Sequence, residues 1–371
     1  MKQIVGKQNN ISDYVMGRIT SKKSLFNRKD QILVDVDAIQ CPSGYTAVIT
    51  LQKETKGSSP IVSVDSIDDF NDGDVVLINK EGEIVFLFEI QSQHNAIFAT
   101  ERCNHRCIMC PQPPVKEEED KTPLNLKLIS LIDKNANEIG ITGGEPTMIG
   151  DKLFELIKQI QKYQPKAAIS ILSNGVVFSN REYAFKLAAC RHHDLQVDIP
   201  LFSDIAEEHN RIVGAKTFYK TVEGLYNLAL AKQKVGIRIV IHKQTYRRLV
   251  QMAEYIYRNF PFATQVAFME METIGNAKKN IEDLWIDPYE YNEELREAVL
   301  LLNDRGMHPL VYNAQLCVLD KDIREFATQS ISDWKDIYIE ECEGCSLKGQ
   351  CAGFFASNKD HHSSYIKKVE I

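Results

Sequence analysis

The sequence predicts an α/β protein in which a parallel sheet forms the central part of the chain. Three observations lead to this fold class. Residues 1–95 contain short β-branched runs bounded by turn residues, which is typical of a β-rich domain. From residue 96 onward, strand-like and helix-like segments alternate about every 30 residues, as they do in consecutive βαβ units. Residues 285–371 begin with a helical pattern and then carry a group of cysteines. We therefore expect three parts, comprising residues 1–95, 96–284 and 285–371.

The composition argues against several classes of protein. The 371 residues carry a net charge of −7, whereas broad binding of nucleic acid needs a basic surface, so we do not expect nucleic acid as a partner. No apolar run reaches the roughly 18 residues of a membrane-spanning helix, and the first residues show no signal-peptide pattern. Seven of the nine cysteines fall into two groups, which is typical of metal ligands in a reducing compartment. We therefore expect a cytoplasmic, metal-binding protein.

The elements of residues 1–95 are predicted to be strands. Five runs are rich in β-branched or aromatic residues, namely QILVDVDAI, YTAVITL, PIVSV, DVVLI and EIVFLFEI. Pro42–Gly44, Asn71–Asp74 and Glu81–Glu83 mark turns next to these runs. No residue in this part suggests catalysis, so we expect a separately folded domain that docks a partner or a peptide.

The central part is predicted to contain six strands, each followed by a helix or a loop. Strands are expected at residues 95–100, 137–144, 167–172, 195–202, 236–242 and 264–271. Helices are expected at residues 124–134, 153–163, 181–190, 218–233 and 247–260. Ligands of such sheets bind at the carboxyl ends of the strands. A cysteine-containing loop, Gly143–Gly144 and Ser173–Gly175 all follow strands at that edge, which makes it the candidate site.

Cys103, Cys107 and Cys110 lie at spacing C-x3-C-x2-C in the sequence CNHRCIMC, with no fourth cysteine nearby. A structural zinc ion takes four ligands, usually from two separated pairs. Three thiolates on one short loop instead fit three corners of a [4Fe–4S] cluster and leave the fourth iron open for a substrate or cofactor. The alternative is a zinc or cluster site with a distant fourth ligand, for example His105 or a later cysteine. The charge run KEEED at residues 116–120 is predicted to be a solvated loop or the start of a helix.

The sequence ITGGEPT, residues 141–147, ends the second predicted strand. Gly143 and Gly144 lack side chains, so the backbone there can approach a ligand closely. The exposed carbonyl groups can accept hydrogen bonds from an ammonium group, Glu145 adds negative charge, and Pro146 stiffens the turn. Alone, the motif indicates only a turn. Because it follows a three-cysteine loop on the preceding strand, it indicates a binding site.

At these residues the chain resembles the radical S-adenosylmethionine (SAM) superfamily, over about residues 95–280. The cysteine loop is similar to that family's cluster loop, and Gly143–Pro146 is similar to its motif for the SAM amino group. The resemblance implies a partial (β/α)6 barrel and a [4Fe–4S] cluster whose open iron binds the amino and carboxylate groups of SAM. It also implies an enzyme that reductively cleaves SAM to methionine and a 5′-deoxyadenosyl radical, which takes a hydrogen atom from the substrate. An electron donor of the flavodoxin or ferredoxin type is implied as a partner.

The same resemblance suggests further SAM contacts. Ser173 and Asn174 end the third strand, where the family often has a Thr-Asn-Gly turn near SAM. A plain Asn-Gly turn would have the same sequence. Arg238, in GIRIVIH, is placed to meet a carboxylate or a ribose, although an arginine on the polar face of a strand is also ordinary.

Two departures from the family pattern concern the cysteine loop and the fourth strand. Residues 201–214 resemble the end of that strand and the His-x-x-x-x-Gly segment that follows it. The usual serine or aspartate late in the strand is replaced by Pro200 and Phe202, so Ser203 is our candidate for that role. Met109 replaces the aromatic residue that often precedes the third cysteine, which is a mild change because backbone does much of the adenine binding in the family.

The second cysteine group lies in ECEGCSLKGQCAGFF and one upstream position. Its members are Cys317, Cys342, Cys345 and Cys351. Four thiolates are enough to saturate one [4Fe–4S] cluster or one Zn²⁺ ion, and both metals accept four sulfur ligands. The spacing resembles the SPASM and twitch tails of radical SAM peptide maturases. That resemblance implies one auxiliary [4Fe–4S] cluster, with zinc as the alternative.

Within the superfamily, the chain resembles the radical SAM maturase of the His-Xaa-Ser system. The stretches that carry this resemblance are FATERCNHRCIMCPQPP, ITGGEPT, IRIVIHKQT and CEGCSLKGQCAGFF. It implies a peptide or small protein as substrate and a second radical SAM protein as partner. A radical SAM enzyme acting on a small molecule or an RNA base is the second hypothesis. The third, from another class, is a non-catalytic Fe–S or zinc protein that serves as a scaffold or sensor.

Overall fold

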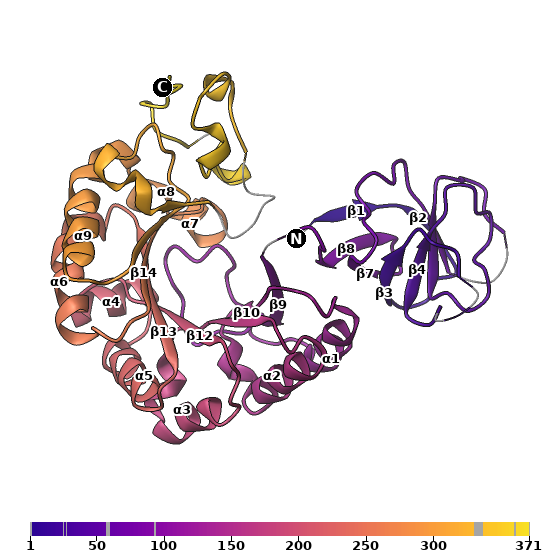
Figure 1. Ribbon diagram of the computed structural model, residues 1–371, viewed down its shortest axis with the longest axis horizontal. Coiled ribbons are helices and arrows are strands. Elements are labelled where there is room, and N and C mark those ends of the chain that lie inside the picture. The colour runs from indigo at the N-terminus through magenta and orange to yellow at the C-terminus, as the bar shows by residue number, and fades with distance from the viewer. Residues whose placement is uncertain are drawn as a thin grey trace. The chain divides into compact units, whose positions relative to one another are not determined.

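The computed structural model describes residues 2–24, 26, 28–56, 60–92, 94–329, 337–359 and 361–370. The chain divides into two compact units (Figure 1). The first unit contains Met1–Ile97, Asp120–Gly140 and Phe154–Ala168. The second contains Phe98–Glu119, Ile141–Leu153 and Ile169–Ile371.

The N-terminal sheet of the first unit has eight strands. They are β1 (Gln3–Val5), β2 (Lys7–Asn9), β3 (Val15–Thr20), β4 (Gln31–Val34), β5 (Ala47–Thr50), β6 (Ile61–Ser63), β7 (Val75–Ile78) and β8 (Glu83–Phe88). Their order is β1-β8-β7-β3-β4-β5-β6-β2, with β3 to β6 mutually parallel and the other pairs antiparallel. Buried isoleucine, valine and phenylalanine side chains fill one core, including Ile19, Ile32, Ile49, Val62, Val76, Ile84 and Phe86. The β-rich character predicted for this part of the chain is confirmed.

This sheet closes on itself through its first strand. β1 and β2 stand at the two ends of the strand order, yet only Gly6 separates them along the chain. A Cβ at Gly6 would lie 2.5 Å from a methyl carbon of Val62 and 2.7 Å from the Ser63 carbonyl oxygen. Glycine therefore allows the segment to change partners at this point, from β8 to β6. One continuous segment therefore joins the two ends of the strand order.

Two helices complete the first unit. They are α1 (Thr122–Leu131) and α2 (Lys152–Tyr163), close to the predicted ranges. Asp133, just after α1, forms an ion pair of 2.6 Å with Arg18 of β3. The side-chain amide of Gln164, at the end of α2, donates to the carbonyl oxygens of Ile129 and Ile132 at 2.8 and 3.1 Å. These bonds connect both helices to their surroundings within the unit.

The second sheet supplies the framework of the candidate site. Its strands are β9 (Asn95–Thr100), β10 (Glu138–Gly143), β11 (Ala168–Leu172), β12 (Leu195–Pro200), β13 (Lys234–Ile241), β14 (Gln265–Glu270), β15 (Pro309–Tyr312) and β16 (Ala327–Thr328). They follow one another in chain order across the sheet, and every pair from β11 to β16 is parallel. The predicted α/β class with a parallel sheet is confirmed.

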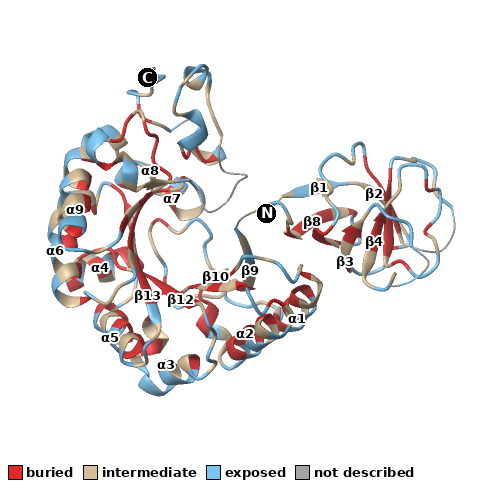
Figure 2. Ribbon diagram, viewed as in Figure 1, coloured by how far each residue is buried: buried red, intermediate tan, exposed pale blue. Residues whose placement is uncertain are grey.

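Helices separate these strands along the chain. They are α3 (Arg181–Ala188), α4 (Ala206–Val213), α5 (Phe218–Leu230), α6 (Leu249–Asn259), α7 (Gly275–Lys279), α8 (Ile281–Leu284) and α9 (Asn292–Asp304). In α6 the buried residues Leu249, Met252, Ala253 and Ile256 recur at helical spacing, so one stripe of the helix packs inward. Figure 2 shows the same pattern for α5 and α9, with buried residues on one side and exposed residues on the other.

The sheet is larger than the six strands that the sequence predicts. The residues after α9 add β15, paired in register with β14, and then the two-residue strand β16. Four and two residues are too few to show a periodicity, so the sequence pattern could not separate them from a loop. The part of the chain expected to be only a cysteine-rich extension therefore also extends the sheet.

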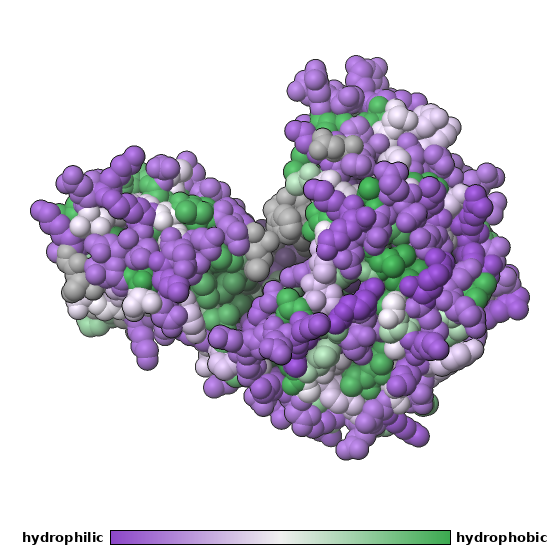
Figure 3. Space-filling model, turned by 180° about the vertical axis from the view of Figure 1, so that it is seen from behind, coloured by the Kyte–Doolittle hydropathy of each residue, from purple (hydrophilic) through white to green (hydrophobic). Residues whose placement is uncertain are grey.

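The surface is largely polar. Hydrophilic side chains cover most of the face seen in Figure 3, and apolar side chains are scattered among them. Among the residues described, we find no helix with the length and apolar character needed to cross a membrane.

Candidate functional site

The cysteine loop begins where β9 ends. Cys103, Cys107 and Cys110 are each partly buried. Burial raises the pKa of all three thiols, that of Cys107 to about 12, and the neighbouring thiols add to the effect at Cys103 and Cys107. The three thiols therefore lie close enough to interact, and positive charge from a bound metal would stabilise them as thiolates. The backbone N–H of His105 already donates to the Cys103 sulfur at 3.4 Å.

Gly143 and Gly144 hold the start of this loop against the end of β10. A Cβ at Gly143 would lie 2.2 Å from the Thr100 carbonyl oxygen, and one at Gly144 would lie 2.3 Å from that of Arg102. The two segments are joined by the Gly144 N–H donating to Thr100 at 2.7 Å and the Glu145 N–H donating to Arg102 at 2.8 Å. The two glycines thus allow the backbone of this motif to pack closely on the cysteine loop. Close approach of a ligand to Gly143 and Gly144 stays a prediction.

Glu145 ties this motif to the next strand. Its buried carboxylate accepts hydrogen bonds from the backbone and hydroxyl of Thr147 at 3.1 and 2.6 Å. It also accepts from the Ser173 hydroxyl at 2.8 Å and the Asn174 backbone at 2.6 Å. Burial raises the pKa of Glu145, while these bonds favour the charged form. The carboxylate that we expected to add charge for a ligand thus also fixes the geometry of the edge, and Pro146 starts a short 3-10 turn beside it.

Asn174 reaches the cysteine loop directly. Its side-chain N–H donates to the Asn104 side-chain oxygen at 2.6 Å. Gly175 follows with a φ of 80°, which is the left-handed conformation that an Asn-Gly turn supplies. The structure thus brings Ser173 and Asn174 together with Glu145 and the cysteine loop.

Two helices hold the other side of the loop. At the end of α4, the carbonyl groups of Ile212 and Val213 accept from the backbones of Ile108 and Arg106 at 3.0 and 2.9 Å. The His-x-x-x-x-Gly segment expected from the sequence is therefore a support of the loop. His209 of that segment is buried, and burial lowers its pKa to about 4.

The second support was not foreseen from the sequence. Asn276 donates through its side chain to the Cys107 carbonyl at 3.1 Å and through its backbone to the Cys110 carbonyl at 2.8 Å. Asn280, one turn later, donates to the Ile108 carbonyl at 2.8 Å. Gly275 has a φ of 60° and meets the Pro111 carbonyl so closely that a Cβ would lie 2.3 Å away. The available signal was a Gly-Asn pair followed by asparagine at helical spacing.

Glu118 was predicted to be part of a solvated charge run, and this is wrong for that residue. Its side chain is only 9% exposed. It accepts hydrogen bonds from the Thr100 hydroxyl and from the Glu101 backbone, the latter at 2.7 Å. Glu118 thus closes the cysteine loop back onto its own start. Nothing in the sequence distinguishes it from the other carboxylates of KEEED, because all have the same chemistry.

The two remaining predicted SAM contacts have other partners in the structure. The Ser203 hydroxyl is buried, donates to Glu208 at 2.7 Å and accepts from the Ile205 backbone at 3.1 Å, so it is used in the turn that precedes α4. The Arg238 guanidinium lies 3.2–3.3 Å from the sulfur of Met269, and burial lowers its pKa. Contact of either residue with SAM stays a prediction.

Comparison with known proteins assigns the family of this central region. The family model described as "Radical SAM superfamily" matches residues 97–256, which include the cysteine loop, the GGEP motif and helix α4, which supports the loop. The central part of the chain is a radical SAM domain. The residue types present fit the family's [4Fe–4S] cluster, because Cys103, Cys107 and Cys110 are three thiols on one hydrogen-bonded loop, and the Cys103 sulfur accepts a backbone N–H. Among the described residues, these three side chains do not already converge on one metal position.

Curated relatives share part of this radical SAM domain. GTP 3′,8-cyclase of Clostridium botulinum (strain Langeland) is 23% identical over 222 residues, which is 58% of this chain and 68% of that protein. Fe-coproporphyrin III synthase of Methanosarcina barkeri is 29% identical over 230 residues, 60% of this chain and 54% of that protein. GTP 3′,8-cyclase of Campylobacter curvus is 27% identical and is covered over 63% of its length. The chain therefore spans about half to two thirds of these relatives.

A solved structure agrees on the fold. Native anSMEcpe with bound AdoMet superposes on the chain with a TM-score of 0.52 at 15% sequence identity. The match covers 74% of this chain and 92% of that one. At this identity the likeness concerns the fold alone, that is, the arrangement of strands and helices.

Beyond the radical SAM domain, the four C-terminal cysteines line one pocket of the second unit. They are Cys317, Cys342, Cys345 and Cys351. Most of the other lining side chains are apolar or aromatic, including Leu316, Leu347, Tyr338 and Phe354. Burial raises the pKa of Cys317 and Cys351, and neighbouring thiols of the group add to the effect. In the part of the chain that the structure describes, no three His, Cys, Asp or Glu side chains already converge on a single metal-ion position.

Backbone N–H groups point at the sulfur atoms of this pocket. Cys351 accepts from Leu316 and Gly353, each at 3.5 Å, and Cys345 accepts from Val369 at 3.4 Å. Hydrogen bonds to sulfur stabilise thiolates and tune the potential of Fe–S clusters. The donor set, four thiols in a mostly apolar pocket with N–H groups behind them, fits one auxiliary [4Fe–4S] cluster and also one zinc ion.

Proposed function

We propose that this protein is a radical SAM enzyme that acts on a peptide or small protein. The observation that carries the proposal is the clamp on the three-cysteine loop, which is fixed by Gly144 and Glu145 on one side and by α4 and Asn276 on the other. Cys103, Cys107 and Cys110 would hold the cluster. When bound, a [4Fe–4S] cluster supplies the electron for reductive cleavage of SAM to methionine and a 5′-deoxyadenosyl radical.

The chain's own contribution is positioning. Direct hydrogen bonds among Glu145, Ser173 and Asn174 fix the carboxyl ends of β10 and β11. The side chain of Asn174 also donates to Asn104 of the cysteine loop, which connects the loop to these strand ends. A reacting group that is held in place in advance loses less entropy in the reaction. The GGEP backbone is the element that we propose for the SAM amino group, with carbonyl oxygens as acceptors.

The C-terminal pocket favours a peptide or protein as substrate. Four cysteines that can saturate a cluster are the pattern of the auxiliary sites found in the peptide maturases that this chain resembles. We propose one auxiliary [4Fe–4S] cluster there, with zinc as the alternative. We also propose maturation of a peptide of the His-Xaa-Ser type, a second radical SAM protein as partner, an electron donor of flavodoxin or ferredoxin type and action in the cytoplasm.

A small molecule is the second candidate substrate. The observation that favours it is the sequence likeness to proteins named GTP 3′,8-cyclase, at 23–27% identity over 222–223 residues. A radical SAM enzyme acting on GTP or a similar compound would use the same cysteine loop. The two candidates therefore differ only at the substrate, and only a substrate assay separates them.

The first test is anaerobic reconstitution with iron and sulfide, followed by iron counting and a 5′-deoxyadenosine assay with dithionite and SAM. About eight irons per chain with 5′-deoxyadenosine formation is the expected result, since two [4Fe–4S] clusters contain that number. Cys107→Ala should abolish 5′-deoxyadenosine formation, whereas Cys190→Ala, which removes a thiol outside both groups, should not. Zinc alone, without SAM cleavage in the reduced protein, would support the scaffold or sensor hypothesis and contradict the enzyme.

The second test addresses the substrate. The reconstituted protein is incubated with SAM and either a synthetic peptide of His-Xaa-Ser repeats or GTP, and products are followed by mass spectrometry. We expect a mass change of the peptide that requires SAM and is lost in Cys345→Ala, while uncoupled SAM cleavage persists in that variant. Conversion of GTP with an unchanged peptide would favour the small-molecule candidate.

A further inference from the structure

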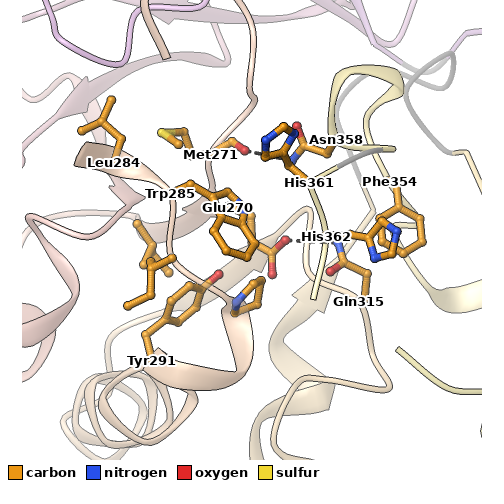
Figure 4. A pocket seen from close by; sticks show the side chains of 13 residues that line it. Glu270, Met271, Leu284, Trp285, Tyr291, Gln315, Phe354, Asn358, His361 and His362 are labelled. Carbon is orange, nitrogen blue, oxygen red and sulfur yellow. Dashed lines mark hydrogen bonds between the residues drawn. The ribbon is translucent and has the colours of Figure 1, made fainter. Parts of the chain in front are cut away.

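A second pocket lies at the same edge of the sheet, outside the cysteine loop. It is formed by the ends of β13 and β14, by the segment between α8 and α9, and by the C-terminal tail (Figure 4). Its central polar group is the carboxyl of Glu270, the last residue of β14. None of the predicted site residues lines this pocket.

The pocket faces away from the predicted SAM contact at Arg238. Arg238 contacts the sulfur of Met269, so these two side chains share one face of the sheet. Side chains of neighbouring residues on a strand point to opposite faces. Glu270 and its register partner Ile241 therefore lie on the other face, where both line the pocket. This is a separate site at the same edge.

The Glu270 carboxyl is partly buried and hydrogen-bonded. It accepts from the Gln315 amide at 3.1 Å and is hydrogen-bonded to the Tyr291 side chain. Burial, with a smaller contribution from the nearby carboxylate of Asp287, raises the pKa of Glu270 to about 8. No lysine or arginine is among the residues that line the pocket in the described part of the chain.

The walls suit an organic cation. Trp285, Tyr291 and Phe354 contribute aromatic side chains, and aromatic faces attract cations by their quadrupoles. Figure 4 shows the Glu270 carboxylate directed toward Gln315, with Trp285 and Tyr291 beside it. The other titratable groups that line the pocket are the imidazoles of the tail, at His361 and His362. A partly buried carboxylate without a counter-charge is less well solvated than one in water, so a cation that enters the pocket gains a favourable partner.

The tail forms one wall of the pocket and is fixed in place. The Asn358 side chain donates to the Met271 carbonyl at 3.0 Å and accepts from the Thr273 backbone at 3.0 Å. Gln315 and Phe354 line both this pocket and the four-cysteine pocket. The Gln315 amide also donates to the Gly353 carbonyl at 3.0 Å, and the Gly353 N–H donates to the Cys351 sulfur. The two pockets are therefore neighbours that share a wall.

We propose that this pocket binds a small primary ammonium group, with Glu270 as its carboxylate partner and Trp285 and Tyr291 as its aromatic walls. Asp287 lies nearby, and the side chains of His361 and His362 complete the lining. In the proposed enzyme the ammonium group belongs to the substrate and is anchored beside the four-cysteine site. That assignment of the ligand to the substrate rests on the proposed function, whereas the binding itself does not.

Binding to the full-length protein tests the proposal without SAM cleavage. The probe is n-butylammonium, and 1-butanol of the same shape is the neutral comparison. Trp285 lines the pocket, so its fluorescence reports occupancy in a background where the only other tryptophan, Trp334, is replaced by phenylalanine. We expect saturable binding of n-butylammonium, at least about tenfold weaker binding of 1-butanol, and a similar loss in Glu270→Gln. Glu290→Gln, which removes an exposed carboxylate on the neighbouring 3-10 turn, should bind as the wild type does.

A calorimetric measurement on the wild type keeps the test independent of the folding of any variant. An empty pocket holds Glu270 mostly protonated at pH 7, because its pKa lies near 8. Binding of an ammonium group favours the carboxylate, so close to one proton should be released at pH 7 and much less at pH 9. Titrations in buffers of different ionisation enthalpy measure this number. Proton release at pH 7 that fades by pH 9 supports the site.

Three results would overturn the proposal. They are no saturable binding of n-butylammonium, equal binding by Glu270→Gln, and binding without proton release at pH 7. Butylguanidinium and 4-methylimidazolium identify the cation class, and tighter binding of either would replace the primary amine. Failure here with intact 5′-deoxyadenosine formation would leave the proposed function standing, so the two proposals fail separately.

Discussion

One of the closest approaches in the candidate site joins Gly144 to the cysteine loop, and Gly144→Ala tests its role. A Cβ there would lie 2.3 Å from the Arg102 carbonyl oxygen and 2.8 Å from that of Glu101. Ordinary van der Waals contact begins at 3.4 Å. The Arg102 oxygen must therefore retreat by about 1.1 Å, the difference between these distances. Because the opposing atoms are backbone and precede Cys103 directly, the whole start of the loop has to move.

The expected losses follow from that displacement. Overpacking in a well-packed region costs about 1–3 kcal/mol. For a unit of this size, each kcal/mol lowers the melting temperature by about 2–4 °C. A misplacement of about 1 Å in a positioned reacting group lowers a rate by about 100-fold. We therefore expect Gly144→Ala to melt several degrees below the wild type and to form 5′-deoxyadenosine about 100-fold more slowly.

Gly150→Ala is the matched control. Gly150 has a φ of 63°, where alanine is strained, but no other atom lies within 4 Å of the added Cβ. Its cost of about 1 kcal/mol comes from backbone strain alone and leaves the cysteine loop in place. Thermal melting and 5′-deoxyadenosine formation are measured for both variants after reconstitution. If Gly144→Ala keeps the 5′-deoxyadenosine rate of Gly150→Ala, the steric argument is wrong.

Three further predictions concern single side chains and one backbone N–H. Asn174→Ala removes the hydrogen bond to Asn104, so the variant should lose iron faster than the wild type when it is diluted into chelator. Asn180→Ala is the comparison variant. Iron loss equal to that of the wild type would contradict this prediction. Val369→Pro removes the backbone N–H that donates to the Cys345 sulfur, whereas Val369→Ala keeps it. Metal analysis should therefore show loss of metal from the C-terminal pocket in the proline variant only. In the unfolded chain the Glu270 carboxyl has a pKa near 4.5, whereas in the folded chain its pKa is about 8. The folded state therefore holds a proton that the unfolded state has lost, so the stability contributed by this group falls as pH rises from about 4.5 to about 8. Glu270→Gln should therefore gain melting temperature relative to the wild type across that range, and a pH-independent difference would refute the burial argument.

The fold was predictable because its signals are local and repeated. Each helix and strand of the central region carries its own periodicity, as α6 does with a buried residue every third or fourth position. β15 and β16 were missed because their pairing with the sheet is decided by neighbouring strands and not by their own short sequences. The predicted helix ends differ from the observed ones by a few residues because the exact end of a helix is also decided by its contacts in the folded chain.

The candidate site was predictable where chemistry requires a particular residue type. Cysteine spacing and paired glycines indicate a site because few other residues can ligate iron or allow such close approach. The supports of that site were not predictable in the same way. Glu118 and Asn276 act through ordinary hydrogen bonds to backbone atoms, and many other residues of the chain could make such bonds. Their roles depend on distances that only the folded chain defines.

The closed N-terminal sheet limits how the first unit could recognise a peptide. Strand addition requires a free sheet edge with unpaired backbone groups. β1 and β2 occupy both ends of the strand order as one segment joined at Gly6, so the backbone groups of these ends already face β8 and β6. Strand addition there is therefore limited to backbone groups that face away from β8 and β6, and any other docking of a peptide on this sheet would use side chains on its faces or loops. Recognition of that kind depends on the peptide's side chains more than on its backbone, which is what discrimination among peptide sequences requires.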